Sequence, residues 1–347
     1  MFKKIVKWIG IVLAGLILIA VFGTLVQLGR GGDYYNEDGS FKHITAKQSF
    51  NFVVNHPAFS GFGQYFVPCE GGFGCAALKP LAIDRALAYI APTWDVETDV
   101  NAINFLIDEV NAGKTIFYDY YSAEDKSADP SKEATGLFFI EGDPGAPFAL
   151  VLPGGGFTTV AMYQEGFPIA QALHEEEYNV FILKYRVGGH EGDTGWKERI
   201  ERANLDIAAA LEYIVDNNDL FHVSTEGYSV WGFSAGGTLA LQWGSSTESG
   251  FSSFGFPAPA AIILGYPAAS IASTDVNIPT FIVICKDDEM IAASSVEAYA
   301  ATLSASATVV EFHMYETGGH GFGVGVGTDA EGWMLNAIDF WERHAGH

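Results

Sequence analysis

Positive charge is scarce in this sequence. Of its 347 residues, 18 are Lys or Arg and 42 are Asp or Glu, so the formal net charge is −24. Proteins that bind the phosphate backbone of nucleic acids need clustered Lys and Arg side chains. The composition therefore argues against nucleic acid as a partner, and also against broad adsorption of the folded body to anionic lipid.

Cysteine is equally scarce. The three cysteines are Cys69, Cys75 and Cys285, and no Cys/His spacing typical of a zinc site accompanies them. We therefore expect no bound metal. Cys69 and Cys75 flank a glycine-rich loop at a spacing that suits a small disulfide, whereas Cys285 ends an apolar run and is expected to be a buried thiol.

The N-terminal segment is the exception to the acidity. Lys3, Lys4 and Lys7 precede an uncharged run over Trp8–Leu28, which is long enough for the roughly 20-residue helix that crosses a bilayer. Cations on the near side favour an orientation that leaves the rest of the chain outside the cytoplasm. We expect a membrane anchor; a signal peptide cleaved near Val21-Phe22-Gly23 is the alternative, and it would give a secreted protein.

Three parts of the chain are predicted. Residues 1–32 form a cytoplasmic stub, the membrane anchor and the start of a linker, residues 33–112 an accessory region, and residues 113–347 the main domain. The clearest accessory element is a helix in which Val96, Val100, Ile103, Ile107 and Val110 recur at helical spacing. The accessory region either pads the main domain, which is the commoner arrangement, or covers its functional site.

The main domain alternates between strand and helix patterns. Apolar runs typical of strands occupy residues 115–121, 137–140, 148–152, 180–185, 228–231, 260–264, 281–285 and 308–315. Helical patterns occupy residues 196–217, the stretch from 235, 294–304 and 331–344. This alternation predicts an α/β fold with a mostly parallel sheet that helices cover on both faces. Functional groups should gather at the carboxyl ends of the strands.

One of these strand-to-helix transitions carries a reactive pattern, Gly232-Phe233-Ser234-Ala235-Gly236. It places Ser234 on a sharp turn, where the hydroxyl stands clear of the sheet. The glycines two residues before and after the serine have a steric reason, because a Cβ at either position would meet the neighbouring strand or helix. Ser234 is therefore a candidate nucleophile.

A serine hydroxyl needs a base, because free serine is a weak nucleophile at neutral pH. His320 is the best candidate among the nine histidines, since it follows the last strand and stands between Gly319 and Gly321. His313 lies inside an alternating strand and is expected to be structural. An acid that orients the base should follow the preceding strand, where Asp287 and Asp288 stand next to each other.

The glycine triad Gly154-Gly155-Gly156, the serine turn, the acid and Gly319-His320-Gly321-Phe322 occur in an order that resembles the α/β-hydrolase superfamily. Within it, the chain is most similar to bacterial serine esterases related to acetyl esterases and acetylxylan esterases. The resemblance covers about residues 115–345. It implies the α/β-hydrolase fold and hydrolysis of a carboxylic ester without a cofactor.

The resemblance also implies residue roles. Members usually have an aliphatic residue three positions after the acid, so Ile291 favours Asp288, with Asp287 and Asp275 as alternatives. The oxyanion donors of relatives correspond to the backbone N–H groups of Gly155, Gly156 and Ala235. Pro153 stands where many relatives have histidine. Arg186 belongs to a Lys-Tyr-Arg motif that braces loops in relatives, and we interpret it as structural.

The function expected from the sequence is hydrolysis of short-chain carboxylic esters, with a small molecule or an acetylated polysaccharide as substrate. The segment between residues 264 and 281 is too short for an inserted cap domain, so the entrance should be open unless residues 41–111 fold over it. The alternatives are a peptidase of the prolyl-oligopeptidase type, which lacks support because no propeller-sized region is present, and a catalytically silent binding protein. The sequence makes no prediction of oligomeric state.

Overall fold

The computed structural model describes residues 33–346 apart from 70–71, 91–93, 189–192, 270–271, 273 and 307. The predicted anchor over Trp8–Leu28 lies outside these residues. Within the described part of the chain, no helix has both the length and the apolar character needed to cross a membrane. The chain divides into two compact units, Met1–Lys42 and His43–His347. In the first, residues 33–42 form a turn closed by an antiparallel bridge between Tyr35 and Phe41.

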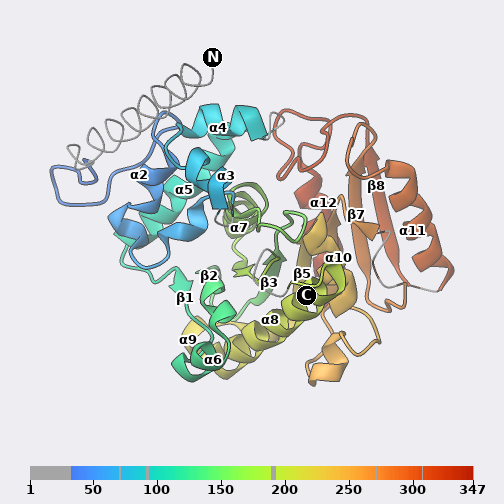
Figure 1. The fold of residues 1–347 in the computed structure, drawn as a ribbon. Helices are drawn as coiled ribbons and strands as arrows, with labels where there is room; N and C mark the ends of the chain where they lie inside the picture. The colour runs from blue at the N-terminus through green and yellow to red at the C-terminus, as the bar shows by residue number, and fades with distance from the viewer. Residues whose placement is uncertain are drawn as a thin grey trace, which may run out of the picture. The chain divides into compact units, whose positions relative to one another are not determined.

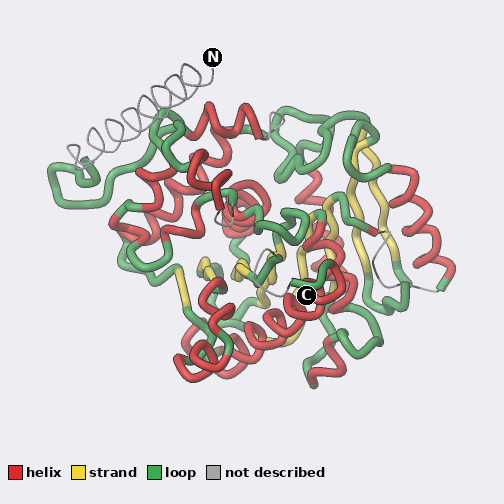
Figure 2. The backbone as a smooth tube through the Cα atoms, viewed as in Figure 1, coloured by secondary structure: helices red, strands yellow, loops and turns green. Residues whose placement is uncertain are grey.

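An eight-stranded sheet forms the centre of the second unit, with the strand order β1-β2-β4-β3-β5-β6-β7-β8 (Figures 1 and 2). The β1–β2 and β2–β4 pairs are antiparallel and all other pairs are parallel, as the sequence predicts. The strands are β1 Phe117–Tyr118, β2 Gly136–Ile140, β3 Pro147–Leu152, β4 Asn179–Lys184, β5 Ser224–Phe233, β6 Ala261–Gly265, β7 Thr280–Cys285 and β8 Val310–Tyr315.

Helices cover both faces of this sheet. In β5, Trp231 and Phe233 point toward Trp333 of α12, whereas a Cβ on the intervening Gly232 would meet α10. Because successive strand residues face opposite sides, α10 and α12 lie on opposite faces. The main-domain helices are α6 Ala123–Ala128, α7 Phe167–Glu175, α8 Trp196–Asp216, α9 Asn218–Phe221, α10 Ala235–Trp243, α11 Ala293–Ala305 and α12 Trp333–Ala345, and the π-helical turn η4 spans Met162–Gly166.

Helix α7 and the turn η4 are absent from the sequence-based prediction. Gly166 is the last residue of η4 and the N-cap of α7, and Pro168 follows within the first turn of α7. Glycine and proline this close together are typical of a loop. Pro168 is nevertheless compatible with a helix here, because the N–H groups of a first turn have no intrahelical acceptor.

The segment before the sheet packs against the main domain as padding. Its elements are α2 Phe50–Val54, η1 Pro57–Phe59, η2 Gly63–Phe66, α3 Gly72–Leu78, α4 Ile83–Ile90 and α5 Val96–Asn111. Helix α5 confirms the predicted helix, begins at the capping side chain of Asp95 and packs against α7. The buried ring of Phe66 stacks at 4.7 Å on Phe167 of α7 and lies 5.9 Å from Phe138 of β2. Cys69 and Cys75 form a disulfide.

We predict that Phe66→Ala lowers the free energy of unfolding by about 3–5 kcal/mol, because it leaves a cavity between the accessory segment and the sheet. Urea unfolding followed by tryptophan fluorescence measures the change. Tyr89→Ala is the matched control, since Tyr89 is 87% exposed and its loss should change stability by no more than about 0.5 kcal/mol. Equal effects of the two variants would contradict the interpretation of this region as packed core.

Candidate active site

Ser234 sits at the tip of the turn between β5 and α10, in a strained backbone conformation with φ 49° and ψ −115°. The turn holds it there through a hydrogen bond from the Ser234 N–H to the Gly265 carbonyl at 3.0 Å. The predicted steric role of the flanking glycines is also seen. A Cβ on Gly236 would overlap the carbonyl of Leu152 in β3, and one on Gly232 would lie 2.5 Å from the carbonyl oxygen of Gly236.

The structure brings Ser234, His320 and Asp288 together. His320 Nε2 lies 2.9 Å from Ser234 Oγ, and His320 Nδ1 lies 2.8 Å from Asp288 Oδ2. A carboxylate only accepts hydrogen bonds, so Nδ1 carries the proton and Nε2 is left to accept the proton of the serine hydroxyl. The Asp288 side chain is fully buried and the His320 side chain is 14% exposed. In this geometry His320 Nε2 can accept the proton of Ser234 during a nucleophilic attack.

The two adjacent aspartates do different things. Asp288 Oδ1 accepts the backbone N–H groups of Met290 at 2.8 Å and Ile291 at 2.7 Å, which leaves Oδ2 for His320. Asp287 instead accepts the N–H groups of Gly318 at 3.2 Å and Gly319 at 2.8 Å. Asp287 therefore anchors the loop that carries the histidine.

The predicted oxyanion donors lie beside the serine. The glycine loop follows β3, which pairs with β5 so that Leu152 stands opposite Gly232. A Cβ on Gly154 would lie 2.7 Å from the Cβ of Ser234. Gly155 and Gly156 have φ values of 114° and 62°, a conformation that favours glycine. The N–H of Ala235 is the first of helix α10 and so has no acceptor within the helix.

Three further side chains of the site are not predicted by the sequence. Buried Glu165 in η4 accepts the N–H of Gly154 at 2.6 Å. Buried Tyr266, which follows β6, lies edge-on to the His320 ring at a centroid distance of 5.1 Å. Gln164 donates to the carbonyl of Gly321. Burial raises the pKa of the Glu165 carboxyl and of the Tyr266 hydroxyl.

The accessory segment reaches the loop of His320 through Trp94. The indole nitrogen of Trp94 lies so close to Gly321 that a Cβ added there would be 3.3 Å from it. Elsewhere in the accessory segment, Phe59 and Phe66 are fully buried in the core. The accessory segment is thus mainly padding, with Trp94 set against the histidine loop.

Other candidate residues of the sequence have structural surroundings. The His313 ring stacks on Phe281 at 4.9 Å and its Nε2 lies 2.8 Å from Glu311. Cys285 is buried, as predicted, and burial raises the pKa of its thiol to about 12. A thiol with that pKa stays protonated and is a poor nucleophile at neutral pH.

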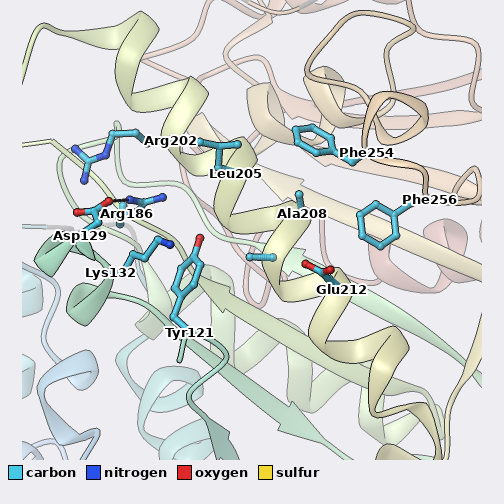
Figure 3. Close-up of a pocket in the computed structure, with 11 residues that line it drawn as sticks. Tyr121, Asp129, Lys132, Arg186, Arg202, Leu205, Ala208, Glu212, Phe254 and Phe256 are labelled. Carbon is cyan, nitrogen blue, oxygen red and sulfur yellow. Dashed lines mark hydrogen bonds and ion pairs between the residues drawn. The ribbon is translucent and has the colours of Figure 1, made fainter. Parts of the chain in front are cut away.

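Arg186 lines a groove of about 510 Å³ beside α8 (Figure 3). Its guanidinium lies 2.7 Å from buried Asp206 and 2.6 Å from Asp129, and Tyr121 donates to Asp206 at 2.7 Å. The other cations of the groove are paired as well, Lys132 with Asp125 at 3.0 Å and Arg202 with Glu198 at 3.6 Å. The groove therefore holds an ion-pair network, and Arg186 has the structural surroundings expected from the sequence.

Among the residues that the structure describes, no three His, Cys, Asp or Glu side chains are grouped in a way that could hold a metal ion.

The chain is similar to known hydrolases in fold, and part of its sequence matches a family model. The BD-FAE family model matches residues 141–254, and a search of curated proteins gave no match. MGS-M1, an α/β hydrolase from a Medee basin deep-sea metagenome library, superposes with a TM-score of 0.51 at 24% identity over 61% of this chain and 93% of its own. An acetyl ester-xyloside bifunctional hydrolase from Caldicellulosiruptor lactoaceticus superposes with a TM-score of 0.51 at 19% identity, over 67% of this chain and 96% of its own. The carboxylesterase Cest-2923 from Lactobacillus plantarum superposes with a TM-score of 0.50 at 20% identity, over 61% of this chain and 92% of its own.

We predict that Asp288→Asn lowers kcat for ester hydrolysis by about 10⁴, because the asparagine amide favours the wrong tautomer of His320. Asp287→Asn is the matched control, one position away. It keeps an acceptor for the Gly319 N–H and should lower kcat by less than about tenfold. Steady-state kinetics of both variants make the comparison, and a larger loss for Asp287→Asn would move the orienting acid to position 287.

Proposed function

Because the chain has the α/β-hydrolase fold, we propose that it hydrolyses carboxylic esters through a covalent acyl-serine intermediate. One observation carries the proposal: a serine hydroxyl on a strained turn lies 2.9 Å from a histidine nitrogen, and the other nitrogen of that ring lies 2.8 Å from a buried aspartate. Nucleophile, base and orienting acid are the three parts that acyl transfer by a serine requires.

The proposed reaction has two steps. In the first, Ser234 Oγ attacks the ester carbonyl while His320 Nε2 takes its proton, and the N–H groups of Gly155, Gly156 and Ala235 stabilise the oxyanion. Collapse breaks the bond to the alcohol oxygen, which receives the proton from His320. In the second, water attacks the acyl-serine by the same route, and the acid and free Ser234 are released.

We further propose short acyl groups, acetyl above all, and an acetylated polysaccharide as one class of substrate. Only residues 266–279 connect β6 to β7, which leaves no room there for the apolar cap that lipases for long chains use. A similar fold belongs to an enzyme described as an acetyl ester-xyloside bifunctional hydrolase, which supports this choice of substrate.

We predict that Ser234→Ala abolishes hydrolysis of p-nitrophenyl acetate, because it removes the attacking oxygen and leaves only binding and the oxyanion donors. The release of p-nitrophenol at 405 nm measures the rate, and circular dichroism checks that the variant folds. A folded alanine variant that keeps most of the wild-type rate would refute Ser234 as the nucleophile. A wild-type protein without activity would favour the alternative of a silent binding protein.

The acyl preference is tested with the wild-type protein alone. We expect kcat/KM to fall from acetyl through butyryl to octanoyl esters of p-nitrophenol, and acetate to be released from acetylated xylan. The reason is that an added apolar chain finds no cap to cover it. A value of kcat/KM that rises steadily toward octanoyl would contradict the short-acyl proposal and leave the serine mechanism standing.

We also propose that the protein is exported and anchored in the cytoplasmic membrane, with the hydrolase outside. The support is the basic N-terminus followed by the uncharged run over Trp8–Leu28. The disulfide between Cys69 and Cys75 agrees with an oxidising compartment.

The full-length protein is predicted to fractionate with membranes, to stay there through a carbonate wash, and to expose a C-terminal epitope to protease added outside the cytoplasm. These outcomes follow from a helix that spans the bilayer in one direction. N-terminal sequencing of the product is the check: a soluble protein that begins near Thr24 would show that the segment is a cleaved signal.

A further inference from the structure

We propose that Glu165 is a positioning residue of the active site, which fixes the glycine loop behind Ser234 and supplies a buried negative charge for His320 during the reaction. This inference rests on the ester hydrolysis proposed above. It assigns to Glu165 an electrostatic role in addition to its packing.

The turn η4 gives Glu165 an unusual placement. All five residues of Met162–Gly166 are buried, and the turn is π-helical, a rare form that recurs at functional sites. Gln164 is 4% exposed and Glu165 is 3% exposed. Two consecutive polar side chains are thus both buried. In a regular surface helix, at least one of two such neighbours usually faces the solvent.

The first contact of Glu165 is with the glycine loop. Its Oε2 accepts the N–H of Gly154 at 2.6 Å, one residue before the proposed oxyanion donors Gly155 and Gly156. A Cβ on Gly154 would lie 2.8 Å from this oxygen and 2.7 Å from the Cβ of Ser234. The carboxylate is therefore directly behind the nucleophile, and its hydrogen bond fixes how the peptide planes of the donors can turn.

The second contact is with the histidine side of the site. The Tyr266 hydroxyl accepts the N–H of Gly323 at 3.2 Å, and the nearby charge of Glu165 adds to the burial that raises its pKa. The Tyr266 ring lies edge-on to His320, and the neighbouring Gln164 donates to the carbonyl of Gly321. One turn of backbone thus connects the glycine loop to the loop that carries the base.

The charge of Glu165 calls for an explanation of its own. Burial raises the pKa of its carboxyl, and the positive charge of His320 opposes that rise. The titratable groups around Glu165 are His320 and Tyr266, with Asp288 beyond them. A neutral glutamine could also accept the Gly154 N–H, through its amide oxygen. What only the carboxylate can do is stabilise the imidazolium that forms when His320 takes the serine proton.

The proposed role predicts opposite effects of Glu165 on activity and on the stability of the fold. A carboxyl whose pKa is raised by folding favours the folded state below its unfolded pKa, and that contribution is lost as the pH rises through the folded pKa. In its ionised form the buried side chain is therefore unfavourable to the folded state. Replacing it with neutral glutamine should leave the melting temperature unchanged or raise it, which a purely structural role would not predict.

The test compares Glu165→Gln with Glu176→Gln, an exposed control at the C-terminal end of the following helix α7. For Glu165→Gln we expect kcat to fall about 10–100-fold, KM to stay within about twofold, and the melting temperature not to fall. The acid side of the pH–activity profile should move to lower pH, because protonated His320 loses a stabilising charge. Glu176→Gln should match the wild-type protein in every measurement.

The outcomes separate this inference from the function on which it rests. A wild-type protein without esterase activity would overturn both. An active wild type together with wild-type kcat in Glu165→Gln would overturn only the role of Glu165. A fall in kcat that accompanies a lower melting temperature and an unmoved pH profile would also overturn it, since packing alone would then account for the loss.

Discussion

The close approach of β3 to the first turn of α10 is the constraint on which the candidate site depends. Gly236 has no space for a side chain because the carbonyl of Leu152 occupies it, and Gly232 is closed off in the same way by the helix. A helix held this near to the sheet forces the intervening Ser234 into a strained conformation and raises its hydroxyl above the strand ends. The loops after β3, β7 and β8 begin at the same edge, and they bring the proposed oxyanion donors, acid and base to it.

Backbone strain is concentrated around this edge. Positive φ values occur at five described residues that are not glycine, and three of them are Phe157, Ser234 and Tyr266 at the site. Each costs folding free energy on the order of 1–3 kcal/mol and persists because neighbouring contacts fix it. The carboxyl of Glu165, whose pKa is raised by burial, lies at the same place. Such unfavourable features are expected to cluster at a site where the arrangement needed for a reaction lowers the stability of the fold.

Local sequence signals predict some parts of the fold and of the candidate site, and they do not predict others. The strand alternation, the serine turn, His320 and helix α5 all have a pattern within a few residues, and the structure places them as that pattern indicates. Glu165, Gln164 and Tyr266 have no such pattern. Their meaning comes from contacts with residues far away in the chain, as when Gln164 donates to Gly321, 157 positions on. Helix α7 is not predicted either, because Gly166 and Pro168 at its start are typical of a loop.

We propose that Ser234 is a nucleophile activated by His320. Reaction of the native protein with a fluorophosphonate, followed by proteolysis and mass spectrometry of the peptides, tests it most directly, since such reagents form a stable bond only with an activated serine. We expect about one adduct per chain, located on Ser234, and no adduct when the protein is denatured by heat before the reaction. A native protein that stays unmodified, or an adduct on another serine, would contradict it.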